Sequence, residues 1–228
     1  MKLFHHPFCP HSRFVRLVLG EYGVSVDLAE EEVMKRRPEF LALNPAGTTP
    51  VLIEDNFPLS GPMVIAEYIE ETRGFTAPDR SLMPADPRVR ADVRRIVNWF
   101  NDKFFTEVSE LLVREKILKR RLSEAEGGGP PDSASIHAAR ANIRYHLKYI
   151  GWLLKTRGWL AADRLTFADL AAAAQLSAID YLGDVPWEED DTAKNWYAKL
   201  KSRPSFRPLL AEIVPGLSAS KVYADLDF

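Results

Sequence analysis

The 228-residue sequence predicts a small α/β unit followed by an all-helical unit. Ten of its 16 prolines lie within residues 1–87, whereas residues 88–129 and 132–185 contain none. Because an interior proline costs a helix about 3 kcal/mol, the long helices belong in the two proline-free stretches. Short strand and helix patterns alternate in the first part, which favours a mixed sheet. We expect the α/β unit over residues 1–74, a linker over 75–87 and the helical unit with its C-terminal tail over 88–228.

Local patterns define the elements of the α/β unit. The helix expected over residues 12–22 carries a buried stripe from Phe14 to Tyr22, and Gly23 ends it. Ser60 is expected to cap a later helix over residues 61–72. The remaining patterns predict strands over 2–5, 24–28 and 51–53, one or two helical turns over 38–44, and a short strand after a turn near residue 56.

The helical unit is predicted from apolar residues at spacings of three and four. Such stripes run from Val89 to Leu112 and from Ile136 to Leu154, separated by the glycine and proline run 127–131. Thr166 and Asp169 have the spacing of a capping box, which predicts the start of another helix. Shorter helices are expected over residues 191–200 and after Pro204.

Composition excludes several classes of function. With 30 basic and 32 acidic residues, the formal net charge of -2 offers no electrostatic footprint for nucleic acid or an anionic membrane. The richest apolar run, residues 167–179, is too short to span a bilayer, so we expect no membrane insertion. The single cysteine, Cys9, excludes an intrachain disulfide and a multi-cysteine metal site. A reducing, cytoplasmic setting is expected.

Cys9 is the main candidate for chemistry. It lies where the first strand gives way to the first helix, and the N–H groups of a helix N-terminus favour a thiolate. Because Ser12 stands where a second cysteine could lie, Cys9 can form a mixed disulfide but no internal one. The alternative is that Cys9 is an ordinary small apolar residue. A zinc site formed by His5, His6, Cys9 and His11 is not expected, because His5 and His6 are adjacent strand residues and point to opposite faces.

A proline directly before a predicted buried strand is a second candidate feature. The bond between Thr49 and Pro50 precedes Val51 and is a candidate cis peptide bond, with a simple turn as the alternative. In a thioredoxin-like layer this backbone lies beside the start of the first helix, where Cys9 is expected.

The assembled motifs resemble the glutathione transferase superfamily over nearly the whole chain. The resemblance implies a thioredoxin-like N-terminal domain, a helical C-terminal domain, a cis Pro50 and homodimers. It rests on the following motifs: Cys9-Pro10-x-Ser12, Asn44-Pro45-x-Gly47-x-x-Pro50-Val51-Leu52, Ile65-x-x-Tyr68, the linker and Thr166-x-x-Asp169.

The resemblance also assigns candidate roles to individual residues. Cys9, with Ser12 beside it, looks like the nucleophile of omega-type and dehydroascorbate-reductase-type members, which form a disulfide with glutathione. The backbone at Thr49 and Pro50 would pair with the tripeptide, and Arg37 could meet its glycyl carboxylate. Glutathione is therefore a candidate ligand, and no cofactor is required.

One departure from the family pattern concerns the third helix. Members usually begin it with an acidic residue followed by Ser or Thr, which hold the γ-glutamyl end, whereas Gly61 and Pro62 stand here. Two or three hydrogen bonds to charged groups, each about 1.5–3 kcal/mol, would be missing. We expect glutathione binding to be weakened by several orders of magnitude, with Ser60 as a partial substitute.

The C-terminal half resembles one subgroup more closely. Residues 180–187, 196–208 and 225–228 look like the alphaproteobacterial transferase-like division proteins that bind the tubulin-like GTPase FtsZ. This resemblance implies a non-catalytic or weakly catalytic dimeric adaptor on the division filament. The subgroup is not defined by a catalytic cysteine, so Cys9 keeps the alternative of a glutathione-dependent thiol transferase open.

Two surface features could bind such a partner. A basic cluster at the end of the long helix is either a solvated helix face or a docking patch for an acidic partner. The C-terminal tail combines acids with an aromatic side chain, and either makes a peptide-like contact or packs back across the subunit. The residues concerned are Arg114, Lys116, Lys119, Arg120 and Arg121 in the cluster, and Asp225, Asp227 and Phe228 in the tail.

Overall fold

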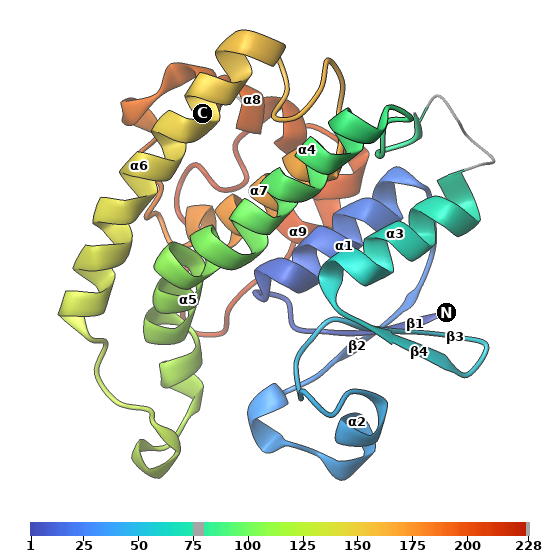
Figure 1. Ribbon diagram of the computed structural model, residues 1–228. Helices are drawn as coiled ribbons and strands as arrows, with labels where there is room; N and C mark the ends of the chain where they lie inside the picture. Colours follow the sequence, from blue (N-terminus) through green and yellow to red (C-terminus); the bar gives the residue numbers. More distant parts are fainter. Residues whose placement is uncertain (75–79, 227–228) are drawn as a thin grey trace.

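A four-stranded mixed sheet forms the centre of the N-terminal part of the protein (Figure 1). The structure, a computed structural model, describes residues 1–74 and 80–226. Strand order is β2-β1-β3-β4, with β2 parallel to β1 and the other two pairs antiparallel. The predicted mixed sheet is thus confirmed. The strands are β1 (Lys2–His5), β2 (Asp27–Glu30), β3 (Val51–Glu54) and β4 (Phe57–Ser60).

Strand β2 begins later than the apolar pattern predicted. Val24 and Val26 pack partly against the core, but pairing with β1 starts only where Asp27 lies beside Lys2. The paired residues Asp27–Glu30 form a largely exposed edge strand. Their sequence has no buried alternation, so the prediction over residues 24–28 was wrong in its bounds.

The helices of this part cover both faces of the sheet. Figure 1 shows α1 and α3 on one face and α2 on the other. Each of these helices has proline in its first position, where the missing N–H removes no intrahelical bond. A 3₁₀ turn, Val33–Lys35, precedes α2. The helices are α1 (Pro10–Glu21), α2 (Pro38–Leu43) and α3 (Pro62–Arg73).

The start of α3 differs from the expected cap. Ser60 is the last residue of β4 and does not cap the helix. Gly61 is the N-cap instead, with a φ of 95° and no side-chain bond. Because a residue with a Cβ rarely adopts that φ, the turn from β4 into α3 favours glycine here.

Helices dominate the described residues after the sheet part, and α1 packs directly against α7. Part of the predicted linker, residues 75–79, lies outside the described residues, and α4 begins at its last residue, Pro87. Short 3₁₀ turns lie at 118–121, 124–126, 187–189 and 204–206. The helices are α4 (Pro87–Asn98), α5 (Glu110–Lys116), α6 (Ser133–Arg157), α7 (Phe167–Tyr181), α8 (Asp191–Lys201) and α9 (Arg207–Leu210).

The long helix predicted from the first apolar stripe contains an unexpected segment. Residues Trp99–Ser109, between α4 and α5, form a π-helix. The wider i→i+5 turns of a π-helix do not follow the 3.6-residue period that the stripe suggested, and they are frequent at functional sites. The apolar spacing therefore predicted a helix here but not its type.

The capping box at the start of α7 is confirmed. Asp169 is fully buried, and its Oδ2 accepts hydrogen bonds of 3.0 Å from the backbone N–H and the hydroxyl of Thr166. Its Oδ1 accepts from the Leu160 N–H and from Trp196 Nε1, each at 3.0 Å. Burial raises the pKa of Asp169 to about 6 although these bonds oppose that rise. One carboxylate thus ties α7 to α8 and to the preceding loop.

A buried arginine joins the two parts of the protein. Arg13 on α1 is fully buried, and its Nε donates to the Pro7 carbonyl at 2.7 Å. Its other nitrogens donate to Ser177 on α7 (2.9 Å), Tyr223 in the tail (3.2 Å) and Glu212 (3.2 Å). The guanidinium also lies 4.5 Å from the centre of the Phe8 ring. Three of these four hydrogen bonds cross the boundary between the sheet and helical parts, and together the four satisfy most of the donors of this buried side chain.

Replacing Arg13 tests this junction. Arg13→Met leaves buried partners without their donor, so we expect the free energy of unfolding in urea to fall by about 3 kcal/mol or more. Tyr223→Phe removes a single hydroxyl and should cost about 1–2 kcal/mol. Arg88→Met, at an exposed position on α4, is the control and should stay within about 0.5 kcal/mol of the parent. An equally small effect of Arg13→Met would contradict this account of the junction.

Candidate functional site

A cleft of about 660 Å³ lies between the two parts of the protein. One wall comes from the start of α1, the loop before β3 and the start of α3. The opposite wall comes from the π-helical segment, α5 and the residues after it, and supplies apolar side chains such as Phe105, Val113 and Leu118. The cleft therefore places the Cys9 thiol opposite a wall that mixes apolar side chains with charged ones such as Arg114 and Arg121. Apolar lining with a few polar groups is typical of small-molecule sites.

Cys9 lies in this cleft as the N-cap residue of α1. Its side chain is half-buried, and its thiol donates to the Thr49 carbonyl over 3.7 Å between sulfur and oxygen. The peptide bond between Thr49 and Pro50 is cis, which confirms the expectation for Pro50. The thiol and the backbone before Pro50 thus lie side by side, as the thioredoxin-like pattern predicted.

His11 gives Cys9 a partner for proton transfer. The Nε2 atom of His11 lies 2.8 Å from the backbone carbonyl of Asn101, and its ring packs on Phe105 with 4.4 Å between ring centres. Because a carbonyl can only accept, Nε2 carries a proton in this contact. That leaves Nδ1 as the nitrogen available to the Cys9 thiol. The Asn101 carbonyl thus orients His11, and His11 can act as the base for the Cys9 thiol, which is the usual arrangement of an activated nucleophile.

The electrostatics of this pair favour the thiolate. Burial works to raise the pKa of Cys9, but the hydrogen bond and charge of His11, with further hydrogen bonds from Ser12, bring it down to about 7. Burial works to lower the pKa of His11, but its bond to Cys9 and the charge of the thiolate raise it above the ordinary value. A substantial fraction of Cys9 is therefore a nucleophilic thiolate at neutral pH.

Several of the expected glutathione contacts lie elsewhere. Arg37 does not line the cleft: its Nε and Nη2 bind the carboxylate of Glu31 at 3.1 and 2.5 Å. Ser60 is exposed and outside the cleft. Gly61 and Pro62 do line it, but neither has a polar side chain and Pro62 has no N–H. Of the predicted contacts, only the backbone at Thr49 faces the cleft beside Cys9.

The basic cluster is spread over several internal contacts. Lys116 pairs with Asp184 at 2.5 Å and Lys119 with Glu115 at 2.6 Å. Arg120 donates to the Gly216 carbonyl at 3.4 Å, and Arg121 lies 3.5 Å from Glu30. Arg114 is exposed and, with Arg121, lines the Cys9 cleft. Asp225 is exposed, whereas Asp227 and Phe228 lie outside the described residues.

Metal and membrane features were also sought in residues 1–74 and 80–226. No three His, Cys, Asp or Glu side chains in these ranges gather closely enough to suggest a metal site. No helix in these ranges combines the length and the apolar character needed to cross a bilayer.

Similarity to known proteins agrees with this architecture. The family described as "Glutathione S-transferase, N-terminal domain" matches residues 3–78. FtsZ-localized protein A of Caulobacter vibrioides is 47% identical over 230 aligned residues, which cover 99% of this chain and 97% of that protein. The chain belongs to the glutathione S-transferase family. The predicted resemblance to the transferase-like division proteins is thereby confirmed.

Solved structures of related proteins superpose on this chain over its full length. A glutathione S-transferase from Sinorhizobium meliloti superposes with a TM-score of 0.97 at 51% identity, covering 100% of this chain and 99% of that one. FzlA from C. crescentus superposes with a TM-score of 0.89 at 45% identity, with the same coverage. The predicted thioredoxin-like domain followed by a helical domain is confirmed.

Two parts of the site were missing from the sequence-based prediction. His11 was considered only as a metal ligand, because its partner Asn101 is 90 positions away. Phe105, which packs on His11, was assigned no role in the site. The histidine within the Cys9-to-Ser12 motif was the available signal, since a histidine two residues after a cysteine at a helix start can turn toward the thiol.

The pH dependence of alkylation tests the Cys9–His11 pair. Since Cys9 is the only cysteine, the rate of iodoacetamide labelling should follow its thiolate and rise through a pKa of about 7. His11→Gln removes the cation that favours the thiolate, so the pKa should move up toward about 8.5 and the rate at pH 7 should fall roughly tenfold. His137→Gln, at an exposed position on α6, should change neither. An unchanged profile for His11→Gln would contradict the pairing.

Proposed function

We propose that this protein is a dimeric adaptor that binds the FtsZ filament in the cytoplasm. The observation that carries the proposal is its 47% identity with FtsZ-localized protein A over nearly the full length of both chains. Similarity of this extent supports a shared partner more strongly than the fold does, because one fold serves many functions. A dimer offers two equal binding surfaces, which would strengthen attachment to a repetitive filament.

The geometry of the Cys9 cleft supports an adaptor over an ordinary transferase. A transferase must hold glutathione by its charged ends, and the side chains expected for this task are turned away or absent. Arg37 is engaged by Glu31, and Gly61 and Pro62 offer no polar side chain at the start of α3. The proposed adaptor role requires none of these contacts.

The basic candidates for the filament contact form two groups, according to whether they already pair with a buried carboxylate. Lys116 and Lys119 already neutralise buried carboxylates, so they support the fold. Arg114, Arg120 and Arg121 are exposed and remain the better candidates for an acidic partner. We extend the proposed contact to the acidic and aromatic residues Asp225, Asp227 and Phe228 of the tail.

Sedimentation with polymerised FtsZ tests the proposal. The parent protein should co-pellet with filaments at low salt, and Arg114→Glu/Arg120→Glu should pellet at least several-fold less because it opposes an acidic partner. Arg88→Glu/Lys155→Glu makes the same charge change at exposed positions on other helices and should pellet like the parent. Cys9→Ser should also pellet normally. Failure of the parent to pellet would remove the proposal.

The activated thiol favours a second candidate function, a glutathione-dependent thiol transferase. The Cys9 thiolate would attack the glutathione sulfur of a mixed disulfide, forming a Cys9–glutathione disulfide and releasing the other thiolate, which takes the proton held by His11. A second glutathione thiol would lose its proton to His11 and attack this disulfide. Oxidised glutathione and the Cys9 thiolate would then be released. The lowered pKa of Cys9 supports this chemistry, while the opening of α3 argues for weak glutathione binding.

Calorimetry with reduced glutathione tests the missing contacts at α3. The parent should bind more weakly than micromolar. Pro62→Ser adds a hydroxyl and an N–H at the start of α3, and one such bond to a charged group should tighten binding about tenfold. Ser60→Ala, outside the cleft, should leave the affinity unchanged. Micromolar binding by the parent would show that other groups hold the ligand.

A further inference from the structure

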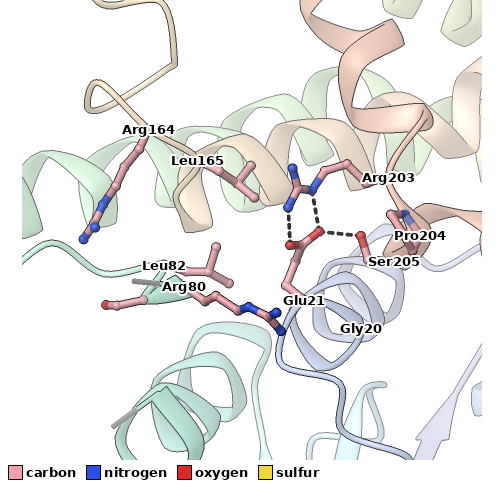
Figure 2. Close-up of a pocket in the computed structure, with 10 residues that line it drawn as sticks. Gly20, Glu21, Arg80, Leu82, Arg164, Leu165, Arg203, Pro204 and Ser205 are labelled. Carbon is pink, nitrogen blue, oxygen red and sulfur yellow. Dashed lines mark hydrogen bonds and ion pairs between the residues drawn. The ribbon is translucent and has the colours of Figure 1, made fainter. Parts of the chain in front are cut away.

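A second cleft, of about 450 Å³, lies at the junction of the two parts (Figure 2). We name it the arginine cleft; it shares no lining residue with the Cys9 cleft. It is bounded by the end of α1, by the segment before α4, by the loop before α7 and by the turn after α8. Its lining residues are Gly20, Glu21, residues 80–82, Arg164, Leu165 and residues 203–205.

One end of the arginine cleft is rigidly built. A Cβ added at Gly20 would lie 2.9 Å from the Cβ of Ser205, so glycine allows α1 to approach this turn closely. Arg203 donates from Nε and Nη2 to the two carboxylate oxygens of Glu21, each at 2.6 Å, and Ser205 adds a third bond at 2.5 Å. The Glu21 carboxylate is therefore already satisfied within the protein.

Two further arginines, Arg80 and Arg164, line the cleft. Within the described residues, neither Arg80 nor Arg164 forms an ion pair, and both are exposed. In Figure 2 the Arg80 side chain runs toward Glu21, whereas Arg164 reaches down from the opposite wall. The nearby Glu70 does not line the cleft. Its carboxylate accepts hydrogen bonds from the Tyr22 hydroxyl, the Ser81 hydroxyl and the Leu82 N–H. Among residues 1–74 and 80–226, no carboxylate thus pairs with either of these two guanidinium groups.

Apolar side chains separate these two charges. Leu82 and Leu165 face each other between Arg80 and Arg164 in Figure 2. Leu82 is fixed in place by its N–H, which lies 3.0 Å from the hydroxyl of Tyr22, and its side chain is almost fully buried. Leu165 is only partly buried, so it supplies the apolar surface that lies between the two cations in Figure 2.

We propose that the arginine cleft binds an acidic peptide segment of a partner protein, with carboxylates on either side of an apolar side chain. Guanidinium groups recognise carboxylates through paired hydrogen bonds, so Arg80 and Arg164 suit two separate acids. Leu165, which faces the buried Leu82, suits the apolar side chain between them. A single small anion would occupy a minor part of 450 Å³ and leave Leu165 uncovered. The proposal depends on neither the Cys9 chemistry nor FtsZ.

Fluorescence anisotropy with a labelled peptide, Asp-Asp-Leu-Asp-Asp, tests this assignment in the full-length protein. We expect submillimolar binding at low salt, and at least tenfold weaker binding by Arg80→Ala/Arg164→Ala. Arg88→Ala/Lys155→Ala removes the same charge from exposed positions outside the cleft and should bind within twofold of the parent. Peptides with Asn for every Asp, or Ser for Leu, should bind at least tenfold more weakly.

Methyl NMR of the unmodified protein locates the peptide independently of any variant. The peptide should shift the methyl signals of Leu82 and Leu165, and inorganic phosphate at the same ionic strength should not. Absence of binding at 1 mM peptide, equal losses in both double variants, equal binding of the Ser peptide, or shifts confined to other leucines would each overturn the proposal.

Discussion

The turn from β4 into α3 decides what the Cys9 cleft can hold. Gly61 has a φ of 95°, a conformation that disfavours any residue with a side chain, and Pro62 occupies the first helical position without an N–H. The residues that form this turn well therefore offer no polar side chain to the charged end of a ligand. Arg37, engaged by Glu31, is held away from the same cleft. The transferase fold is kept, while much of the expected ligand contact is absent from it.

The thiol of Cys9 is nonetheless held in an activating environment, and both parts of the protein contribute to it. His11 comes from α1, whereas the carbonyl that orients it belongs to Asn101 in the π-helical segment. The two segments keep their relative position because α1 packs on α7 and because Arg13 joins α1 to α7 and the tail. The reactivity of Cys9 and the docking of the two parts are thus consequences of the same packing, and a change at Arg13 would disturb both.

Local signals predicted much of the fold but little of the detailed site. Strand β1, the helical turns that begin at Pro38, the cis Pro50 and the capping box of Thr166 and Asp169 depend on neighbours in sequence, and all were predicted. Other features depend on distant partners. The charged side chain of Arg13 suggests a surface position in the sequence. In the structure it is fully buried and donates hydrogen bonds to Ser177, Glu212 and Tyr223. The pairing of Arg37 with Glu31 also required the fold to be known. The apolar pattern near β2 placed that strand too early, because the paired residues Asp27–Glu30 are largely exposed.

We propose that this family member, which has an enzyme's fold, attaches to FtsZ filaments without using its thiol. Blocking Cys9 with iodoacetamide and comparing filament attachment before and after modification tests this claim most directly, because the chain has a single cysteine. The modified and unmodified proteins should pellet with FtsZ to the same extent. Attachment that disappears when the thiol is blocked, or that is absent from the start, would contradict it.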